Sequence, residues 1–241
     1  DNGYYNSVAP QGDAVRGSNY VRLVRDAGTA PVAGFSATPT NGGAPLAVVF
    51  ADVSTGTITN RFWDFGDGAT TNTGATNLTH AYRFPGTNTV QLTVRGPLGS
   101  STTNHLVVAA SVDTVGDGIP DWWRALHFGG NGTTTNGQSC ATCDPDEDGS
   151  PNRSEAGAGT SPTNIASSLA IEAVVAGELD GTVVTWQSVN GKIYRIQRST
   201  NLLSDGFTAT LATGIAATSP KNAFTDTTAN AGANFYRIAV E

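Results

Sequence analysis

Apolar and polar side chains alternate along much of this chain with the two-residue period of a β-strand. The alternation is most regular between residues 30 and 110. Its apolar positions there include Leu46, Val48 and Phe50, followed by Val90, Leu92 and Val94. Successive side chains of a strand point to opposite faces, so these stretches predict strands with one buried face. Together with the turn signal Asp67-Gly68, they predict a β-sandwich over residues 30–110.

The same alternation returns in residues 166–241. Its apolar positions are Val184 and Trp186, Tyr194 and Ile196, and Tyr236, Ile238 and Val240. Asn190-Gly191 lies between two of these stretches and favours a tight hairpin turn. About six strands of ordinary length fit here, which predicts a second, smaller sandwich.

One further alternating stretch, Asn19–Arg25, lies near the start of the chain and has Val21 and Leu23 on one face. Residues 1–29 are too few to bury a core of their own. Two interpretations stay open. Either the chain is a piece of a longer protein, or this strand pairs with an open edge of a neighbouring domain or subunit.

Residues 111–165 break the alternation. Asp121–Gly129 reads as a short helix that stops at Gly129-Gly130. Its apolar side chains, expected to form a small core, are Trp122, Trp123, Leu126 and Phe128. The predicted fold class is therefore all-β: two immunoglobulin-like β-sandwiches joined by a linker with one or two short helices, plus an extra N-terminal strand. The corresponding segments are 1–29, 30–110, 111–165 and 166–241.

The formal net charge of −7 is concentrated in two short stretches. Residues 113–121 contribute −3 from three aspartates, and residues 144–155 contribute −4 from five acidic residues and one arginine. The remaining chain is neutral and offers no basic surface for nucleic acid or an anionic membrane. No apolar run approaches the roughly twenty residues of a membrane-spanning helix. We therefore expect neither a nucleic-acid partner nor a membrane span.

The second acidic stretch, Asp144–Glu155, matches every position of the calcium-loop pattern D-x-[DN]-x-[DN]-G-x5-E. The predicted ligands are Asp144, Asp146, Asp148, Ser150 through its carbonyl, Asn152 at the often water-bridged ninth position, and Glu155 as the bidentate closing residue. Hard oxygen donors of this kind suit a hard divalent cation. Carboxylates packed so closely repel one another unless a cation neutralises them. We therefore predict one bound Ca²⁺ here and not simply a solvated turn.

The first acidic stretch, residues 113–121, follows the same pattern imperfectly. Its candidate ligands are Asp113, Asp117 and Asp121 through their carboxylates and Ile119 through its carbonyl. Val115 replaces the third-position acid, and Arg124 replaces the closing glutamate. Binding of a second Ca²⁺ therefore stays open, and it would require water or ligands from elsewhere.

Two cysteines, Cys140 and Cys143, stand immediately before the calcium loop. Such a CxxC pair occurs in redox motifs, zinc half-sites and tight disulfides. No other zinc ligands lie nearby and no βαβ pattern accompanies the pair, so we interpret it as a structural disulfide. A disulfide fits an oxidising, calcium-rich exterior. The chain also has no Met and begins at Asp1, as does an exported product after processing or a fragment trimmed at that point.

Four motifs of the first predicted sandwich resemble the PKD domain family. They are WDFGDG at Trp63–Gly68, HAY at His80–Tyr82, Pro85-Gly86, and TVQLTV at Thr89–Val94. The resemblance implies an immunoglobulin-like sandwich with an extracellular spacer or adhesion role, usually without catalysis. We interpret Trp63 as a core residue, and Asp64 and Asp67 as turn residues, in preference to a carbohydrate-binding platform.

The remaining two segments carry looser resemblances. DTVGDGIPDWW at 113–123, the CxxC pair and the loop after it are similar to thrombospondin type 3 and dockerin-like calcium segments, which implies calcium that stiffens a junction between modules. Residues 166–241 resemble fibronectin type III domains without a distinctive motif.

No catalytic constellation stands out. His80, His105 and His127 fall in different contexts, and the GxSxG, HExxH, P-loop and dinucleotide motifs are absent. We therefore expect a non-catalytic, secreted structural protein that is part of a bacterial surface appendage, filament or adhesive layer. It would associate with itself or with another surface protein through its N-terminal strand. The alternative is a glycan-binding accessory region of a secreted polysaccharide-degrading enzyme, with exposed aromatic residues in a row on one sandwich face.

Overall fold

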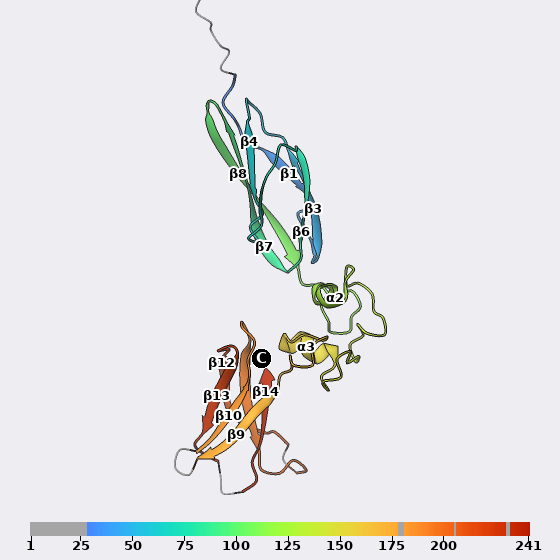
Figure 1. Ribbon diagram of the computed structural model, residues 1–241, viewed down its shortest axis with the longest axis vertical. Helices are drawn as coiled ribbons and strands as arrows, with labels where there is room; N and C mark the ends of the chain where they lie inside the picture. The colour runs from blue at the N-terminus through green and yellow to red at the C-terminus, as the bar shows by residue number, and fades with distance from the viewer. Residues whose placement is uncertain (1–27, 178–180, 205, 230–231) are drawn as a thin grey trace, which may run out of the picture. The chain divides into compact units, whose positions relative to one another are not determined.

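The computed structural model describes residues 28–177, 181–204, 206–229 and 232–241. The predicted strand at Asn19–Arg25 therefore lies outside the described residues. Strands dominate the described part of the chain, which has two short helices, and the all-β, immunoglobulin-like fold class is confirmed (Figure 1).

The described chain divides into two compact units, and the division passes through the first sandwich. One unit comprises Phe50–Leu78 and Val90–His105 with the residues up to Ser36, and the other comprises Ala37–Val49, Thr79–Thr89 and Leu106–Glu241.

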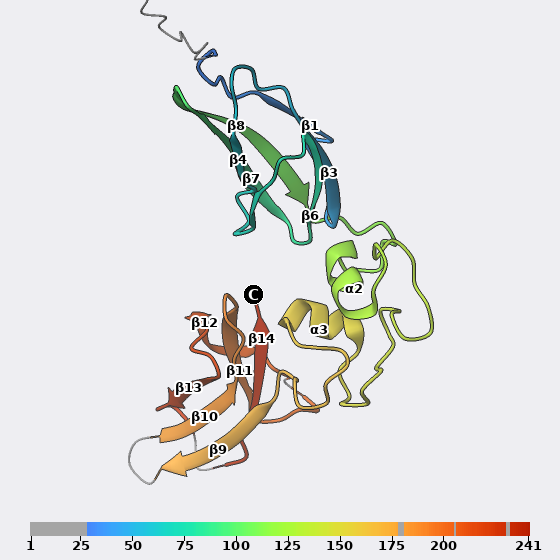
Figure 2. The same cartoon turned by 45° about the horizontal axis from the view of Figure 1, so that its top comes forward.

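The first sandwich contains eight strands. They are β1 (Phe35–Thr38), β2 (Asn41–Gly43), β3 (Leu46–Asp52), β4 (Asn60–Asp64), β5 (Thr70–Asn72), β6 (Asn77–Tyr82), β7 (Gly86–Gly96) and β8 (Gly99–Ala110). A three-stranded sheet has the order β1-β3-β6, and a five-stranded sheet has the order β2-β8-β7-β4-β5. Figure 2 labels β1, β3 and β6 of the first sheet and β4, β7 and β8 of the second. The alternating stretches around Val48 and Leu92 thus form strands β3 and β7, as their pattern predicts.

The inward faces of these strands form a closed aromatic and aliphatic core. Trp63 of β4 is fully buried, and its ring centroid lies 5.0 Å from that of Phe35 and 5.7 Å from that of Phe50. The carboxylates beside it order the turn, since Asp64 accepts from Gly66 N at 2.9 Å and Asp67 from Ala69 N at 3.1 Å. Trp63 is therefore a core residue and presents no face to a ligand.

Two helices interrupt the strands between residues 111 and 165. Helix α2 (Asp121–Phe128) begins after Pro120 and ends at Gly129, while α3 (Asn152–Ala158) begins after Pro151 and ends at Gly159, whose φ of 79° suits glycine. Neither described helix is long and apolar enough to cross a membrane.

The small core expected from the apolar side chains of α2 is only partly correct. Trp123 is buried, whereas Leu126 is 50% exposed and Trp122 only half-buried. The helix packs one tryptophan inward because its inner face is shared with the buried Arg124.

The second sandwich has six strands among its described residues. They are β9 (Ile171–Gly177), β10 (Gly181–Gln187), β11 (Ile193–Ser199), β12 (Ala209–Ala216), β13 (Lys221–Asp226) and β14 (Phe235–Val240). They form two antiparallel three-stranded sheets, with the orders β13-β10-β9 and β12-β11-β14. The central buried side chains are Val184, Trp186, Tyr194 and Ile196, which the sequence predicted to face inward.

A buried carboxylate ties the two sheets of this sandwich together. Asp226, at the end of β13, accepts from Arg198 Nη1 of β11 at 2.6 Å and from the Tyr236 hydroxyl of β14 at 3.0 Å. Its other oxygen accepts from the amide and hydroxyl of Thr228 at 2.9 and 2.7 Å. Burial alone would raise the pKa of Asp226, but the hydrogen bonds from Thr228, Arg198 and Tyr236 outweigh it and hold the pKa below its ordinary value.

We predict that Asp226→Asn lowers the free energy of unfolding of the second sandwich by about 3 kcal/mol at neutral pH, because Arg198 loses its charged partner. A carboxyl whose pKa is lower in the folded than in the unfolded protein stabilises the folded state at pH values above its unfolded pKa of about 4. This contribution is lost as the pH falls through the pKa of the folded state. Urea unfolding at pH 7 and pH 3 should therefore show a gap in the free energy of unfolding between the native chain and the variant that is smaller at the lower pH. A gap of equal size at both pH values would contradict the assignment.

Candidate metal centre

The predicted calcium loop starts from a short disulfide. Cys140 and Cys143 are bonded, with their Cα atoms 5.1 Å apart, and Cys143 N donates to Cys140 O at 3.1 Å. The predicted disulfide is thus present. It forms a tight turn that leads directly into Asp144, and the loop then runs into helix α3.

Three aspartates of the loop converge. Asp144, Asp146 and Asp148 each place a carboxylate oxygen within 4.8 Å of those of the other two. Backbone amides hold one oxygen of each side chain: Gly149 N donates to Asp144 at 2.9 Å, Asp148 N to Asp146 at 3.4 Å, and Ser150 N to Asp148 at 2.7 Å. The second oxygen of each carboxylate is buried and has no hydrogen-bond partner.

Helix α3 supplies two more oxygens of the same kind. Asn152 is 0% exposed, and its Nδ2 donates to the carbonyls of Gln138 and Cys140, both at 2.7 Å, which leaves its Oδ1 without a partner. Glu155 is 1% exposed, and its Oε1 accepts from the Thr160 hydroxyl at 3.3 Å while its Oε2 has no partner. Five of the six predicted ligand residues therefore carry a buried, unpartnered oxygen.

The electrostatics of this cluster are unfavourable without a cation. Burial raises the pKa of Glu155 to about 7, and the charges of Asp146 and Asp148 push it in the same direction, against the hydrogen bond from Thr160. An unsatisfied buried polar atom costs roughly 1–3 kcal/mol, and charged groups cost more. The donors present, four carboxylates and an amide oxygen, fit the chemistry of Ca²⁺. The role predicted for the Ser150 carbonyl stays a prediction.

The first acidic loop has a different arrangement, because its candidate ligands all have partners in the protein. Asp113 accepts from the amides of Gly116 and Gly118, both at 2.7 Å. Slight burial raises the pKa of Asp113, but these amide hydrogen bonds outweigh it and lower the pKa. Asp121 accepts from the Thr114 amide at 2.9 Å and from the Thr114 hydroxyl at 2.5 Å.

Arg124 provides the positive charge of this first loop. Its side chain is 1% exposed, and its Nη2 donates to both oxygens of Asp117, at 2.7 and 2.8 Å. Its other nitrogens reach the carbonyls of Ile119 at 3.5 Å, Gly132 at 2.9 Å and Ser139 at 3.2 Å. The guanidinium therefore interacts with two of the four predicted ligand groups.

The two loops thus differ at their twelfth position. Glu155 closes the second loop with a carboxylate, whereas Arg124 closes the first with a cation. A second Ca²⁺, bound by Asp113, Asp117, Ile119 and Asp121, stays a prediction, and it would require Arg124 to leave Asp117.

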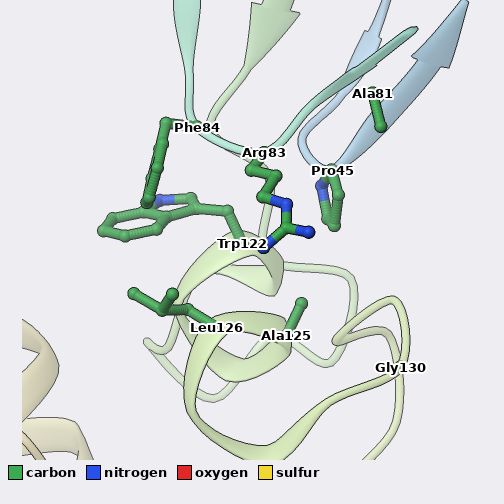
Figure 3. A pocket seen from close by; sticks show the side chains of 8 residues that line it. All are labelled: Pro45, Ala81, Arg83, Phe84, Trp122, Ala125, Leu126 and Gly130. Atoms are coloured by element: carbon green, nitrogen blue, oxygen red, sulfur yellow. The ribbon is translucent and has the colours of Figure 1, made fainter.

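A separate cavity of about 300 Å³ lies beside α2, and all its lining residues belong to the second compact unit (Figure 3). They are Pro45, Ala81, Arg83, Phe84, Trp122, Ala125, Leu126 and Gly130. The rings of Phe84 and Trp122 meet edge to face with their centroids 5.8 Å apart, and Phe84 is 54% exposed. The lining offers one guanidinium and no carboxylate, so it lacks a general acid–base pair.

Each of the three histidines packs against an aromatic ring. The centroid distances are 4.8 Å for His80 and Tyr82, 4.4 Å for His105 and Phe35, and 4.6 Å for His127 and Trp123. Burial lowers the pKa of His127.

Sequence reasoning missed two polar partners of this region. In the sequence, Arg124 was noted only because it replaces the closing glutamate at the twelfth position of the loop. A positively charged residue at that position was itself a signal that the protein supplies the cation that pairs with the loop's aspartates. Thr160 had no signal, because its contact with Glu155 depends on how the chain turns after Gly159.

Comparison with known proteins identifies one segment. Residues 28–110 match the PKD domain family. None of the curated proteins compared with the chain matches it.

Three solved structures are similar to this chain, two of them over about a third of its length. The PKD1 domain of the metalloprotease PrtV from Vibrio cholerae is 30% identical, and the match covers 34% of this chain and 100% of that one, with a TM-score of 0.29. The PKD1 domain of Vibrio anguillarum Epp is 27% identical over 34% and 94% of the two chains, with a TM-score of 0.29. A carbohydrate-binding module of the β-sandwich superfamily is 17% identical over 87% and 84%, with a TM-score of 0.32. The assignment of the first sandwich rests on the family match.

We predict that Arg124→Gln destabilises residues 111–165 by about 3 kcal/mol, because it leaves Asp117 unpaired and three carbonyls without their donor. Near-ultraviolet circular dichroism during thermal unfolding, to which Trp122 and Trp123 contribute together with the buried Trp63 and Trp186, would measure the loss. Arg195→Gln removes the same charge from an exposed position on β11, outside residues 111–165, and should leave the transition unchanged. Equal effects of the two variants would contradict a structural role for Arg124.

Proposed function

Because residues 28–110 are a PKD domain, a type of module that occurs in extracellular proteins, we propose that this chain is a non-catalytic extracellular structural protein stiffened by calcium. The proposed role is that of a subunit in a bacterial surface filament, appendage or adhesive layer.

The observation that carries the calcium part is the set of unpartnered oxygens. The calcium-loop pattern selected six residues from the sequence, and five of them carry a buried oxygen with no hydrogen-bond partner. Ordinary acidic turns expose their carboxylates to water, so burial without partners is the feature a bare turn does not explain. A divalent cation bound by Asp144, Asp146, Asp148, Asn152 and Glu155 would satisfy these atoms.

A structural role, as opposed to a signalling one, follows from the small core of this segment. Among the described residues from 111 to 165, the buried apolar side chains are Ile119, Trp123, Ala158 and Pro162. A segment with so little apolar burial needs another source of stability, and metal binding supplies folding free energy directly.

The proposed cation would also hold helix α3 at the start of the second sandwich. Lys192, just before β11, donates to the carbonyl of Gly157 in α3 at 2.7 Å, and both residues lie in the second compact unit. Glu155, on the same helix, is a candidate ligand, so order in the loop is transmitted to the contact with Lys192. Stiffening of a junction between modules is the expected result.

Glycan binding is the second candidate function, and the aromatic pair beside α2 is the observation that favours it. Trp63 and Trp186 are both fully buried and offer no platform, but Phe84 and Trp122 are accessible and lie next to Arg83. Retention on an insoluble polysaccharide that Trp122→Ala abolishes, and that Leu203→Ala at a fully exposed position does not, would establish this function. Free passage of the native chain would remove it.

We predict that excess calcium raises the melting temperature of the chelator-treated chain. A ligand at about 100 times its Kd stabilises the folded state by about 2.7 kcal/mol. Differential scanning calorimetry with and without chelator would measure the shift, and isothermal titration would give the number of ions bound. An unchanged melting curve in excess chelator would refute a structural role for calcium.

Two variants of equal charge test which residues bind. Glu155→Gln and Glu147→Gln each remove one negative charge, but Glu147 is exposed and occupies no ligand position, whereas Glu155 closes the loop. We expect Glu155→Gln, like Asp148→Ala, to lower the calcium affinity at least about tenfold, or 1.4 kcal/mol, and Glu147→Gln to leave it nearly unchanged. Equal losses would indicate a diffuse attraction of the cation.

A further inference from the structure

Strand β14 leaves one side of the second sandwich open. In the sheet β12-β11-β14 it lies at the edge, and within the described residues it pairs with β11 alone. Immunoglobulin-type sandwiches contain about seven strands, and this one has six described strands.

The register shows which backbone groups face this open edge. Glu241 N donates to Ile193 O at 2.9 Å, which makes this a hydrogen-bonded pair. Antiparallel pairs alternate, so the next pairs bonded to β11 contain Ala239 and Arg237. The N–H and C=O groups of the residues in between, Val240, Ile238 and Tyr236, therefore point away from β11.

The same three residues carry the inward side chains, and those side chains are incompletely covered. Tyr236, Ile238 and Val240 pack against the buried core yet all remain half-exposed. In the first sandwich, by contrast, Val90, Leu92 and Val94 of β7 are fully buried. Among the described residues, therefore, nothing supplies a hydrogen-bonding partner or a full apolar cover along the outer side of β14.

The other edges of this sandwich are protected by irregularity or by charge. The pairing of β9 shifts between Thr185 and Trp186 of its partner, and the pairing of β12 shifts as well. Pro220 precedes β13, and Lys221, its first residue, forms an ion pair with Glu172. Such features discourage an added strand.

Strand β14 has none of these protections. Its six pairs with β11 run without a shift, and it contains no proline or lysine. Its one charged side chain, Arg237, is held by Gln197 Oε1 at 2.7 Å and lies over the Phe207 ring. A regular, unguarded edge beside a partly covered core favours the addition of a strand.

We propose that β14 accepts the segment Asn19–Arg25 of a second copy of this chain as an added strand. The segment alternates as a strand does, with Val21 and Leu23 on one face, and residues 1–29 are too few to bury that face within themselves. Its seven residues match the six of β14 in length. Head-to-tail repetition of this contact gives an open chain of subunits.

This inference rests on the assembly part of the proposed function and is independent of calcium, because no candidate ligand lies in β14. The first experiment measures the assembly of the full chain by sedimentation velocity over a range of concentrations. We expect association of the native chain and an apparent dissociation constant raised at least about tenfold by Leu23→Asp, because the variant would bury a charge. Val24→Asp is the matched control, since the alternation places Val24 on the opposite face, and we expect it to associate as the native chain does.

The second experiment locates the acceptor by hydrogen exchange. A synthetic peptide of residues 17–27 is added to the full-length Leu23→Asp chain at about ten times its Kd, where occupancy should slow exchange of the amides of Tyr236, Ile238 and Val240 about tenfold. The same peptide with Leu23→Asp should give no protection. Protection of β9, β12 or β13 in place of β14, or an unprotected β14 in a chain that stays monomeric, would overturn the inference. Protection of β14 in the native chain even at high dilution would also overturn it, because the segment would then bind within its own chain.

Calcium dependence is measured on the same samples. A monomeric chain that calcium still stabilises would refute the strand addition alone. An assembling chain that calcium does not stabilise would refute the calcium part of the proposed function and leave the strand addition standing.

Discussion

Repulsion among buried negative charges is the constraint on which the segment between the two sandwiches depends. The constraint applies to two loops, whose first residues, Asp113 and Asp144, are 31 residues apart in the sequence. In the first loop the guanidinium of Arg124 neutralises Asp117 and binds carbonyls at the same time. In the second loop no basic side chain takes that place, and buried oxygens are left without partners. The carboxylates of the first loop are thus neutralised by an arginine of the protein itself, and those of the second, as we propose, by a bound metal ion.

Much of the fold follows from local pattern. Alternation located strands such as β3, β7 and β10, because a two-residue period survives wherever one sheet face is buried. The helix at Asp121 and the disulfide at Cys140 also followed from short motifs. The accessibility of Leu126 did not, since it depends on the buried side chain of Arg124, which occupies part of the inner face of the helix.

The candidate ligand residues of the metal centre could be predicted from the sequence, but the residues that hydrogen-bond to them could not. The loop pattern encodes spacing, so it selected Asp144 to Glu155 and brought Asp144, Asp146 and Asp148 together. The loop pattern carries no information on Gln138, which lies 14 residues before Asn152 in the sequence and whose carbonyl accepts a hydrogen bond from the Asn152 side-chain amide. Contacts of this kind arise from how the disulfide turn folds against the helix. The hydrophobic alternation likewise does not predict which strands of the second sandwich lie at an edge, because it indicates which face of a strand is buried and not how many neighbouring strands it pairs with.

Asn152 connects the disulfide turn to the candidate calcium loop. Its backbone amide donates to Cys143 O at 2.8 Å, and its side-chain amide donates to the carbonyls of Gln138 and Cys140. These bonds orient the side chain so that its remaining oxygen is fixed before any ligand arrives. A preorganised donor loses little entropy on binding, so the disulfide turn, through Asn152, favours a cation in the loop that follows it. The cystine and the proposed metal centre therefore act as one unit, which explains why the two motifs adjoin in a segment with so little apolar core.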